Sequence, residues 1–297
     1  MNEERLQALL SVYKHTAAMP DLRSITPIRR RPVWPWLAAA AAVLIAVFVM
    51  VRPRGRHDWI VTSGLIPRTL NEGEVVSTPT GSRVRLESRE IGIVDVAERT
   101  TLRLTGRHRL ELAAGTIHAK TKSPPGIFIV DTPRARATDL GCEYVLSIAE
   151  NGAGSLRVSF GWVELDSFSQ TLVPQGAKAI IASDGRLTPP VFEDAPLAFQ
   201  EAVRRYAFGS RDDLRTILAL ARRRDALTLI NLFRLATPEE RMEIYDRLNQ
   251  LVPAPPGITR DAMQYWTYRT TDKWWPDILK ASGVNAIKKK KRMPRGL

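Results

Sequence analysis

The chain has 297 residues, with 44 Lys and Arg against 31 Asp and Glu, and a net charge of +13. Hydrophobic residues make up 44% of it, which excludes a disordered basic tail and allows sizeable cores. The single cysteine, Cys142, excludes an internal disulfide and a zinc site built from cysteines, and the basic excess favours anionic surfaces as partners.

Residues 1–32 carry one amphipathic stripe. Apolar side chains recur at helical spacing, and they are Leu6, Leu9, Leu10 and Tyr13. One short helix cannot bury its own stripe, so we expect it to dock on a partner or lie on a membrane. A frayed helix with no partner is the alternative interpretation. Pro20, Pro27 and Pro32 then indicate a linker.

Residues 33–51 form an uncharged run of 19 residues. As a helix this run is roughly 28 Å long, close to the ~30 Å hydrocarbon core of a bilayer. Trp34 and Trp36 suit the membrane interface, and arginines flank both ends. A buried helix of a soluble core rarely has such flanks, and the apolar part of a signal peptide is usually only ~7–15 residues long. The run therefore predicts a retained single transmembrane helix.

The flanking charges give only weak evidence for the orientation of this helix in the membrane. Arginines at positions 23, 29, 30 and 31 precede it, and arginines at positions 52, 54, 56 and 68 follow it. The N-terminal cluster is more compact, which leans towards a cytoplasmic N-terminus under the positive-inside rule.

Residues 58–190 are strand-like. Short runs rich in Val, Ile, Leu and Thr alternate with turn signals, which predicts strands at 74–77, 83–86, 91–96, 101–104, 109–112, 116–119, 127–131, 143–148, 155–160, 162–165 and 178–181. One apolar face per strand indicates packed antiparallel sheets or a coiled β-solenoid. The fold class is therefore mainly β plus α.

This region resembles the FecR family of membrane-anchored regulators. The resemblance lies in six short motifs that occur in the family's order. They are Thr-Pro-Thr-Gly-Ser at 78–82, Leu-Glu-Leu-Ala-Ala-Gly-Thr-Ile-His-Ala at 110–119, Phe-Ile-Val-Asp-Thr at 128–132, Leu-Gly-Cys-Glu-Tyr-Val-Leu at 140–146, the Leu-Arg-Val and Gly-Trp-Val pair at 156–158 and 161–163, and Val-Pro-Gln-Gly at 173–176. Two positions depart from the family pattern, since Cys142 replaces the usual threonine and Tyr144 the usual phenylalanine.

The resemblance implies a β-domain on the periplasmic side of the bacterial inner membrane and an N-terminus in the cytoplasm. Family members relay a signal, often from an outer-membrane receptor, to a sigma factor of the extracytoplasmic-function type. The inner membrane, a sigma factor at the N-terminal segment and an envelope protein or receptor at the outer domains are thus the expected partners. Sigma-binding members carry a longer cytoplasmic helical domain, whereas residues 1–32 leave room for one helix.

Residues 191–285 carry patterns typical of helices. They predict helices at 198–208, 212–223, 226–235, 238–251 and 260–268, and a last one from 274, arranged as a small bundle. Trp266, Trp274 and Trp275 suggest a docking surface or, alternatively, the closing layer of the bundle. Arginines 222–224 are interpreted as a solvated helix end rather than a nucleic-acid patch, and residues 286–297 as a basic tail.

The sequence carries no signature of an enzyme, a cofactor site or a metal site. Its four histidines lack metal-ligand spacing, although His108 and His118 would face each other across a hairpin turning at Gly115. Cys142 is expected to be a small buried residue rather than a nucleophile. Two hypotheses remain: a relay to a sigma factor, or an envelope binding or scaffold module with no sigma-factor contact.

Overall fold

Strands make up the first part of the described chain. A computed structural model of the protein describes residues 59–63 and 67–285. The strands are β1 (Trp59–Val61), β2 (Arg68–Thr69), β3 (Val75–Thr78), β4 (Val84–Ser88), β5 (Gly92–Val96), β6 (Thr100–Gly106), β7 (Arg109–Thr121), β8 (Ile129–Asp131), β9 (Arg136–Asp139), β10 (Glu143–Ile148), β11 (Gly154–Phe160), β12 (Trp162–Asp166), β13 (Gln170–Pro174), β14 (Ala177–Ile181) and β15 (Val191–Phe192). The expectation of a β-rich chain with additional helices is confirmed.

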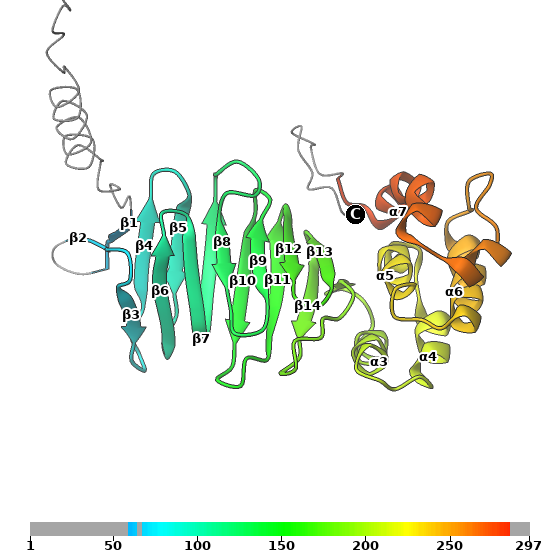
Figure 1. The fold of residues 1–297 in the computed structure, drawn as a ribbon, viewed down its shortest axis with the longest axis horizontal. Coiled ribbons are helices and arrows are strands. Elements are labelled where there is room, and N and C mark those ends of the chain that lie inside the picture. The colour runs from blue at the N-terminus through cyan, green and yellow to red at the C-terminus, as the bar shows by residue number, and fades with distance from the viewer. Residues whose placement is uncertain (1–58, 64–66, 286–297) are drawn as a thin grey trace, which may run out of the picture. The chain divides into compact units, whose positions relative to one another are not determined.

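The strands form two layers that are continuous through β7. The first layer has the order β2-β1-β4-β5-β7-β10-β11-β14-β15, and the second has the order β3-β6-β7-β8-β9-β12-β13. Every pairing in the described sheet is antiparallel except that of β7 with β8. The predicted antiparallel packing therefore holds, and the strands run side by side as Figure 1 shows.

β7 changes layer at Gly115. Residues before it pair with β6 and β8, and residues from Gly115 onward pair with β5 and β10. Gly115 has φ +103°, and a Cβ there would lie 2.3 Å from Thr100. The prediction of two strands and a hairpin turn at Gly115 is wrong, because this glycine allows one 13-residue strand to bend between layers.

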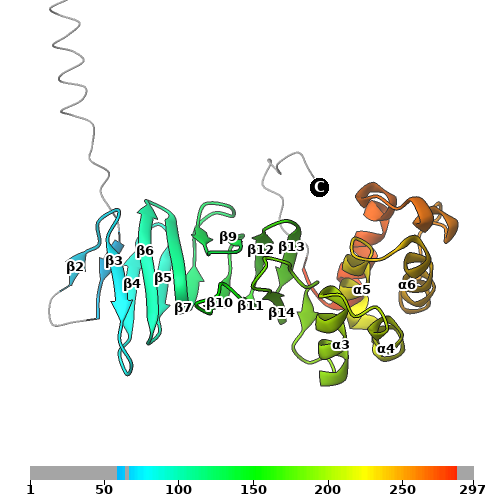
Figure 2. The ribbon, with the colours of Figure 1, turned by 60° about the horizontal axis from the view of Figure 1, so that its bottom comes forward.

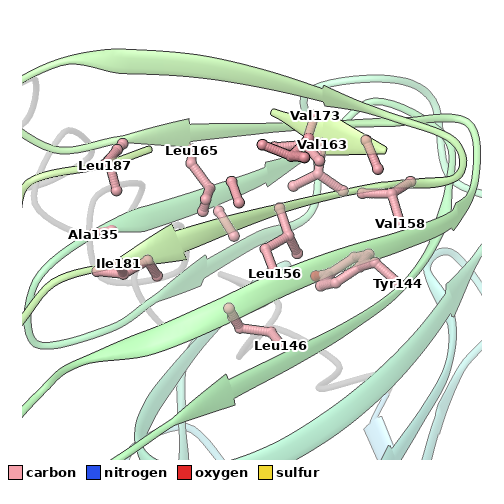
Figure 3. Packing of buried hydrophobic residues seen from close by; sticks show 14 of the residues in the cluster. Ala135, Tyr144, Leu146, Leu156, Val158, Val163, Leu165, Val173, Ile181 and Leu187 are labelled. Atoms are coloured by element: carbon pink, nitrogen blue, oxygen red, sulfur yellow. The ribbon is translucent and has the colours of Figure 1, made fainter. Parts of the chain in front are cut away.

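The core lies between the two layers. Alternate residues of each strand are buried, as the period of two in the sequence predicts. Figure 3 shows Tyr144, Leu146, Leu156 and Val158 of the first layer with Val163, Leu165 and Val173 of the second. Burying each such side chain contributes about 1.5–3 kcal/mol, so this interface is the main source of stability in the strand region.

Helices follow β15 near the end of the sheet formed by β13 and β14 (Figures 1 and 2). They are α3 (Leu197–Ala207), α4 (Asp213–Leu220), η2 (Arg223–Asp225), α5 (Ala226–Leu232), α6 (Pro238–Leu251), η3 (Asp261–Tyr265), η4 (Tyr268–Trp274) and α7 (Trp275–Ser282), where η marks 3₁₀ turns. Strands and helices belong to one compact unit with a continuous core. The predicted helix at 260–268 is instead two 3₁₀ segments.

The start of α6 follows from its sequence. Thr237 accepts a hydrogen bond from the Glu240 amide, and the Glu240 carboxylate accepts one from the Thr237 amide. With Pro238 at the first turn, this capping box satisfies backbone donors that helix formation leaves unpaired.

The predicted transmembrane run, residues 33–51, lies outside the described residues. Within residues 59–63 and 67–285, no helix is long and apolar enough to cross a membrane. The predicted segments 1–32 and 286–297 also lie outside the described part.

Replacing Gly115 with alanine tests the bend in β7. We expect Gly115→Ala to lower the free energy of unfolding by about 3 kcal/mol or more, because positive φ and a collision with Thr100 add together. Gly81→Ala is the control, since Gly81 also has positive φ (+80°) but has nothing within 4 Å of the added Cβ. Urea unfolding measures both, and equal destabilisation of the two variants would contradict the assignment.

Candidate functional site

The predicted docking residues divide into three groups. Leu6, Leu9, Leu10 and Tyr13 lie outside the described residues. Trp274 is fully buried, while Trp266 and Trp275 are half-buried.

Trp274 is a core residue and not part of a docking surface. Its indole nitrogen donates to the Val252 carbonyl at 3.2 Å, and its ring meets Tyr245 edge-on at 5.5 Å between centroids. The expectation that Trp274 contacts a partner is therefore wrong, because the indole fills the space between α6 and α7. The alternative interpretation, that it closes the bundle, is correct for this residue.

Trp266 sits at the edge of an exposed aromatic group. Its ring stacks on Phe233 at 5.9 Å and meets Tyr268 at 5.0 Å, and Arg241 lies 5.4 Å from its centroid. Tyr265 and Tyr268 are 79% and 52% exposed. These two tyrosines are more exposed than Trp266, Trp274 and Trp275.

Arginines of the helical region contact the strands. Arg234 donates to the Gln170 carbonyl and the Thr171 hydroxyl of β13, and burial lowers the pKa of its guanidinium. Arg224 stacks over Phe192 at 4.2 Å and bonds Asp194 at 2.8 Å. Arg222 also pairs with Asp194. The interpretation of arginines 222–224 as a solvated helix end is therefore wrong for Arg222 and Arg224. Their side chains contact Asp194, which follows β15, and so connect the helices to the strands.

The threonine of the 78–82 motif is a structural residue. Thr78 is buried, donates to the Ala97 carbonyl at 2.5 Å and accepts from the Thr100 amide at 3.0 Å. The Thr100 hydroxyl in turn accepts from the Thr116 amide at 2.9 Å. This chain of contacts links β3, β6 and β7 at the place where β7 bends.

The 140–146 motif encloses a buried carboxylate. Asp139 is fully buried and accepts from the Thr121 hydroxyl at 2.7 Å, the Cys142 thiol at 2.8 Å and the Gly141 amide at 2.5 Å. Burial raises the pKa of Asp139, and these hydrogen bonds oppose the rise. Cys142, at the position of the family's threonine, thus supplies the donor that a hydroxyl would supply.

The side chains of Cys142 and Tyr144 are poorly suited to act as nucleophiles or as acid–base groups. Burial first, and then the neighbouring Asp139 charge, raise the pKa of the Cys142 thiol well above its usual range, so the thiolate nucleophile does not form. Burial likewise raises the pKa of Tyr144, whose hydroxyl has no hydrogen-bond partner in the described structure. The expectation of a buried, non-nucleophilic cysteine agrees with this geometry.

The two predicted hairpin histidines do not face each other. His108 lies 2.6 Å from Glu90, and His118 lies 3.1 Å from Glu143 on another strand. Within the described part of the chain, no cluster of three or more His, Cys, Asp or Glu could hold a metal ion.

A groove of about 400 Å³ lies over β4, β5 and β7, and both polar residues and the apolar Val84, Val96 and Ala97 line it. Register explains its composition, because Arg85 pairs with Asp95 and Asp95 pairs with His118 across three neighbouring strands. Ser63, Arg83 and Thr116 also line it. The sequence interpretation missed this groove, since strand alternation marks these side chains as outward-facing but not as neighbours.

The region that contains the motifs matches a known family. Residues 74–164, from just before β3 into β12, match the sequence model of the family described as FecR protein. Residues 74–164 are therefore similar to the FecR family. The resemblance that the motifs predicted is therefore confirmed, and its last motif, at 173–176, falls beyond the matched FecR residues.

Solved structures offer two similar chains. Both are crystal structures of a protein from Parabacteroides distasonis provisionally assigned as an anti-sigma factor, at 1.65 and 2.50 Å resolution. The first is 21% identical over 41% of this chain and 60% of the other, with a TM-score of 0.36. The second is 20% identical over 42% and 58%, with a TM-score of 0.27. The match thus spans about 60% of each solved chain, and no curated protein matches.

Substitutions at Cys142 test its role as a donor to Asp139. We expect Cys142→Ala to lower the free energy of unfolding by about 1–3 kcal/mol, because a buried carboxylate loses a hydrogen bond. Cys142→Ser, which keeps a donor, is the matched control and should retain most of the stability.

The pH dependence of this loss has a definite sign. The folded-state pKa of Asp139 is raised, so its contribution to stability is complete below the unfolded pKa and is lost as pH rises through the folded pKa. Removing the thiol raises the Asp139 pKa further. Chemical unfolding should therefore show a larger deficit for Cys142→Ala at neutral pH than under mildly acidic conditions, and a deficit independent of pH would contradict this role.

Proposed function

We propose that the protein is a membrane-anchored FecR-type regulator that relays an envelope signal to a sigma-factor system of the extracytoplasmic-function type. The match of residues 74–164 to the FecR family carries this proposal. The conformation of this region supports it, because the motif residues Thr78, Gly115 and Cys142 make contacts that hold the two-layer fold together.

A role in binding fits the described unit better than a role in catalysis. The only thiol is buried beside a carboxylate, and its raised pKa keeps it protonated. Exposed groups that suit recognition, by contrast, include Tyr265, Tyr268 and the groove over β4, β5 and β7.

The anchor and the inner partner form the finer part of the proposal. Residues 33–51 supply an uncharged run of bilayer length, and the stripe of Leu6, Leu9, Leu10 and Tyr13 supplies an apolar face for a sigma factor. On this proposal the described unit lies in the periplasm of a bacterial cell and contacts an envelope protein or receptor, while the N-terminus is cytoplasmic.

An envelope binding or scaffold module is the second candidate. The observation that favours it is that Tyr265, Tyr268 and the groove over β4, β5 and β7 are exposed on one compact unit, which could bind a partner without any relay. In this case residues 1–25 would be only a flank of the anchor.

The stripe in residues 1–32 distinguishes the two functions. If the relay operates, Leu9→Asp should reduce capture of a sigma factor on residues 1–32 by about tenfold or more, because a charge replaces a central apolar contact. Ser11→Asp, on the opposite face of the same helix, is the control and should leave capture unchanged.

Transcription from a sigma-dependent promoter gives the second readout. Deleting residues 1–25 should abolish its response to the envelope signal while the protein remains expressed. An unchanged response, together with no sigma factor recovered by residues 1–32, would reject the relay and favour the scaffold module.

A further inference from the structure

We infer that the groove over β4, β5 and β7 is a binding site for a small hydroxylated anion, one that carries a carboxylate or a phosphate group on a sugar-sized body. This inference goes beyond the proposed function, since it requires neither the membrane span nor a sigma factor. It rests on the volume of the groove, its charge balance and the polar groups along its sides.

The charges in the groove leave one cation unmatched. The Arg85 guanidinium makes a two-point contact with Asp95, with Nε–Oδ1 2.6 Å and Nη2–Oδ2 3.2 Å, so these charges balance. Arg83, two residues before Arg85, is exposed and forms no ion pair or hydrogen bond within residues 59–63 and 67–285. The lining therefore has a net positive charge next to Arg83.

Carboxylates near the groove already accept hydrogen bonds from other groups, and Glu87 accepts one from the Thr62 hydroxyl at 3.3 Å. Glu98, at the same end of the β4–β5 pair, accepts from the Gly81 amide at 2.6 Å. Glu143 accepts from His118 at 3.1 Å and lies 3.3 Å from the Lys120 ammonium. A free guanidinium offers a planar set of donors that fits a carboxylate or phosphate in a two-point contact.

The apolar Val84, Val96 and Ala97 can contact the body of a ligand, and the remaining polar residues of the lining suit its hydroxyl groups. Thr116, whose hydroxyl donates to Ser147 at 2.9 Å, and His118 stand on β7 across the groove from Arg83. Ser63 lies at the rim, where its hydroxyl accepts from the Arg85 amide at 3.1 Å. Each of these polar atoms keeps capacity for a further hydrogen bond.

The dimensions of the groove set the size of the ligand. A volume of about 400 Å³ falls in the range of small-molecule sites, roughly 300–1,000 Å³, and admits one sugar-sized molecule. The site is open on one side, which also allows the terminal unit of a longer acidic chain to enter. Arg83 would bind the anionic group, and Thr116 and His118 would bind the hydroxyls.

Titration calorimetry on the full-length protein in detergent micelles tests this assignment. The probes are glucuronate, glucose 6-phosphate and uncharged glucose. We expect at least one of the two anions to bind and glucose not to bind. Binding of only glucuronate would identify a carboxylate ligand, binding of only glucose 6-phosphate would identify a phosphate ligand, and either result supports the site.

Arg83→Gln should weaken anion binding by about tenfold or more, because the charge-assisted contact is lost. Arg89→Gln is the matched control, since Arg89 is an exposed arginine in the turn after β4, roughly 20 Å away along the strand, and it should bind like the wild type. Arg83→Lys should restore part of the affinity by restoring the charge.

Thermal unfolding of each variant checks that the fold is intact. Within residues 59–63 and 67–285, Arg83 forms no ion pair or hydrogen bond that the substitution would remove. The inference is overturned if neither anion binds the wild-type protein, if glucose binds as tightly as the anions, or if Arg83→Gln and Arg89→Gln bind equally well.

Discussion

The fold depends on a single strand that serves two layers. β7 pairs with β6 and β8 in its first half and with β5 and β10 in its second, so the two layers are continuous only through it. The bend requires close approach of Gly115 to Thr100, and the hydroxyl of Thr100 replaces a backbone partner for the Thr116 amide at that point. The core between the layers, and hence the register of the strands around it, follows from this contact.

The motif residues lie next to the same bend. Thr78 completes the contacts around Thr100 on one side of it. On the other side, Cys142 of the 140–146 motif and Thr121 at the end of β7 donate hydrogen bonds to the buried carboxylate of Asp139. The groove also begins at this strand, because Thr116 and His118 follow the bend and face outward next to Asp95. Motif residues thus support the fold, whereas the groove is lined mostly by residues outside the motifs.

Alternation predicted most strands because one face of each is buried in a common core. β10 at 143–148 and α6 at 238–251 agree with the sequence to the residue, since a clear apolar period or a capping box defines each. β9, with the sequence Arg-Ala-Thr-Asp, was missed because it is short and polar and is held by its neighbours β8 and β12. The prediction of a turn at Gly115 is wrong because a glycine that follows small residues occurs both in hairpin turns and in bent strands, and the sequence does not distinguish the two.

The candidate sites were harder to predict than the fold. The buried contact of Asp139 with Cys142 joins residues three apart, yet only the structure shows that both face inward. The groove joins β4, β5 and β7 through register, which the sequence does not specify. The sequence left Trp274 open between a docking surface and the closing layer of the bundle, because a high density of aromatic residues occurs in both, and the structure places it in the core.

The proposed function requires that the region similar to the FecR family lie outside the inner membrane and be anchored by residues 33–51. Fusion of a reporter enzyme that is active only in the periplasm, placed after Arg56, measures this most directly. We expect an active fusion, and we expect loss of activity when residues 33–51 are deleted. An inactive fusion with the protein expressed at a normal level would contradict the topology, and with it the proposed direction of the relay.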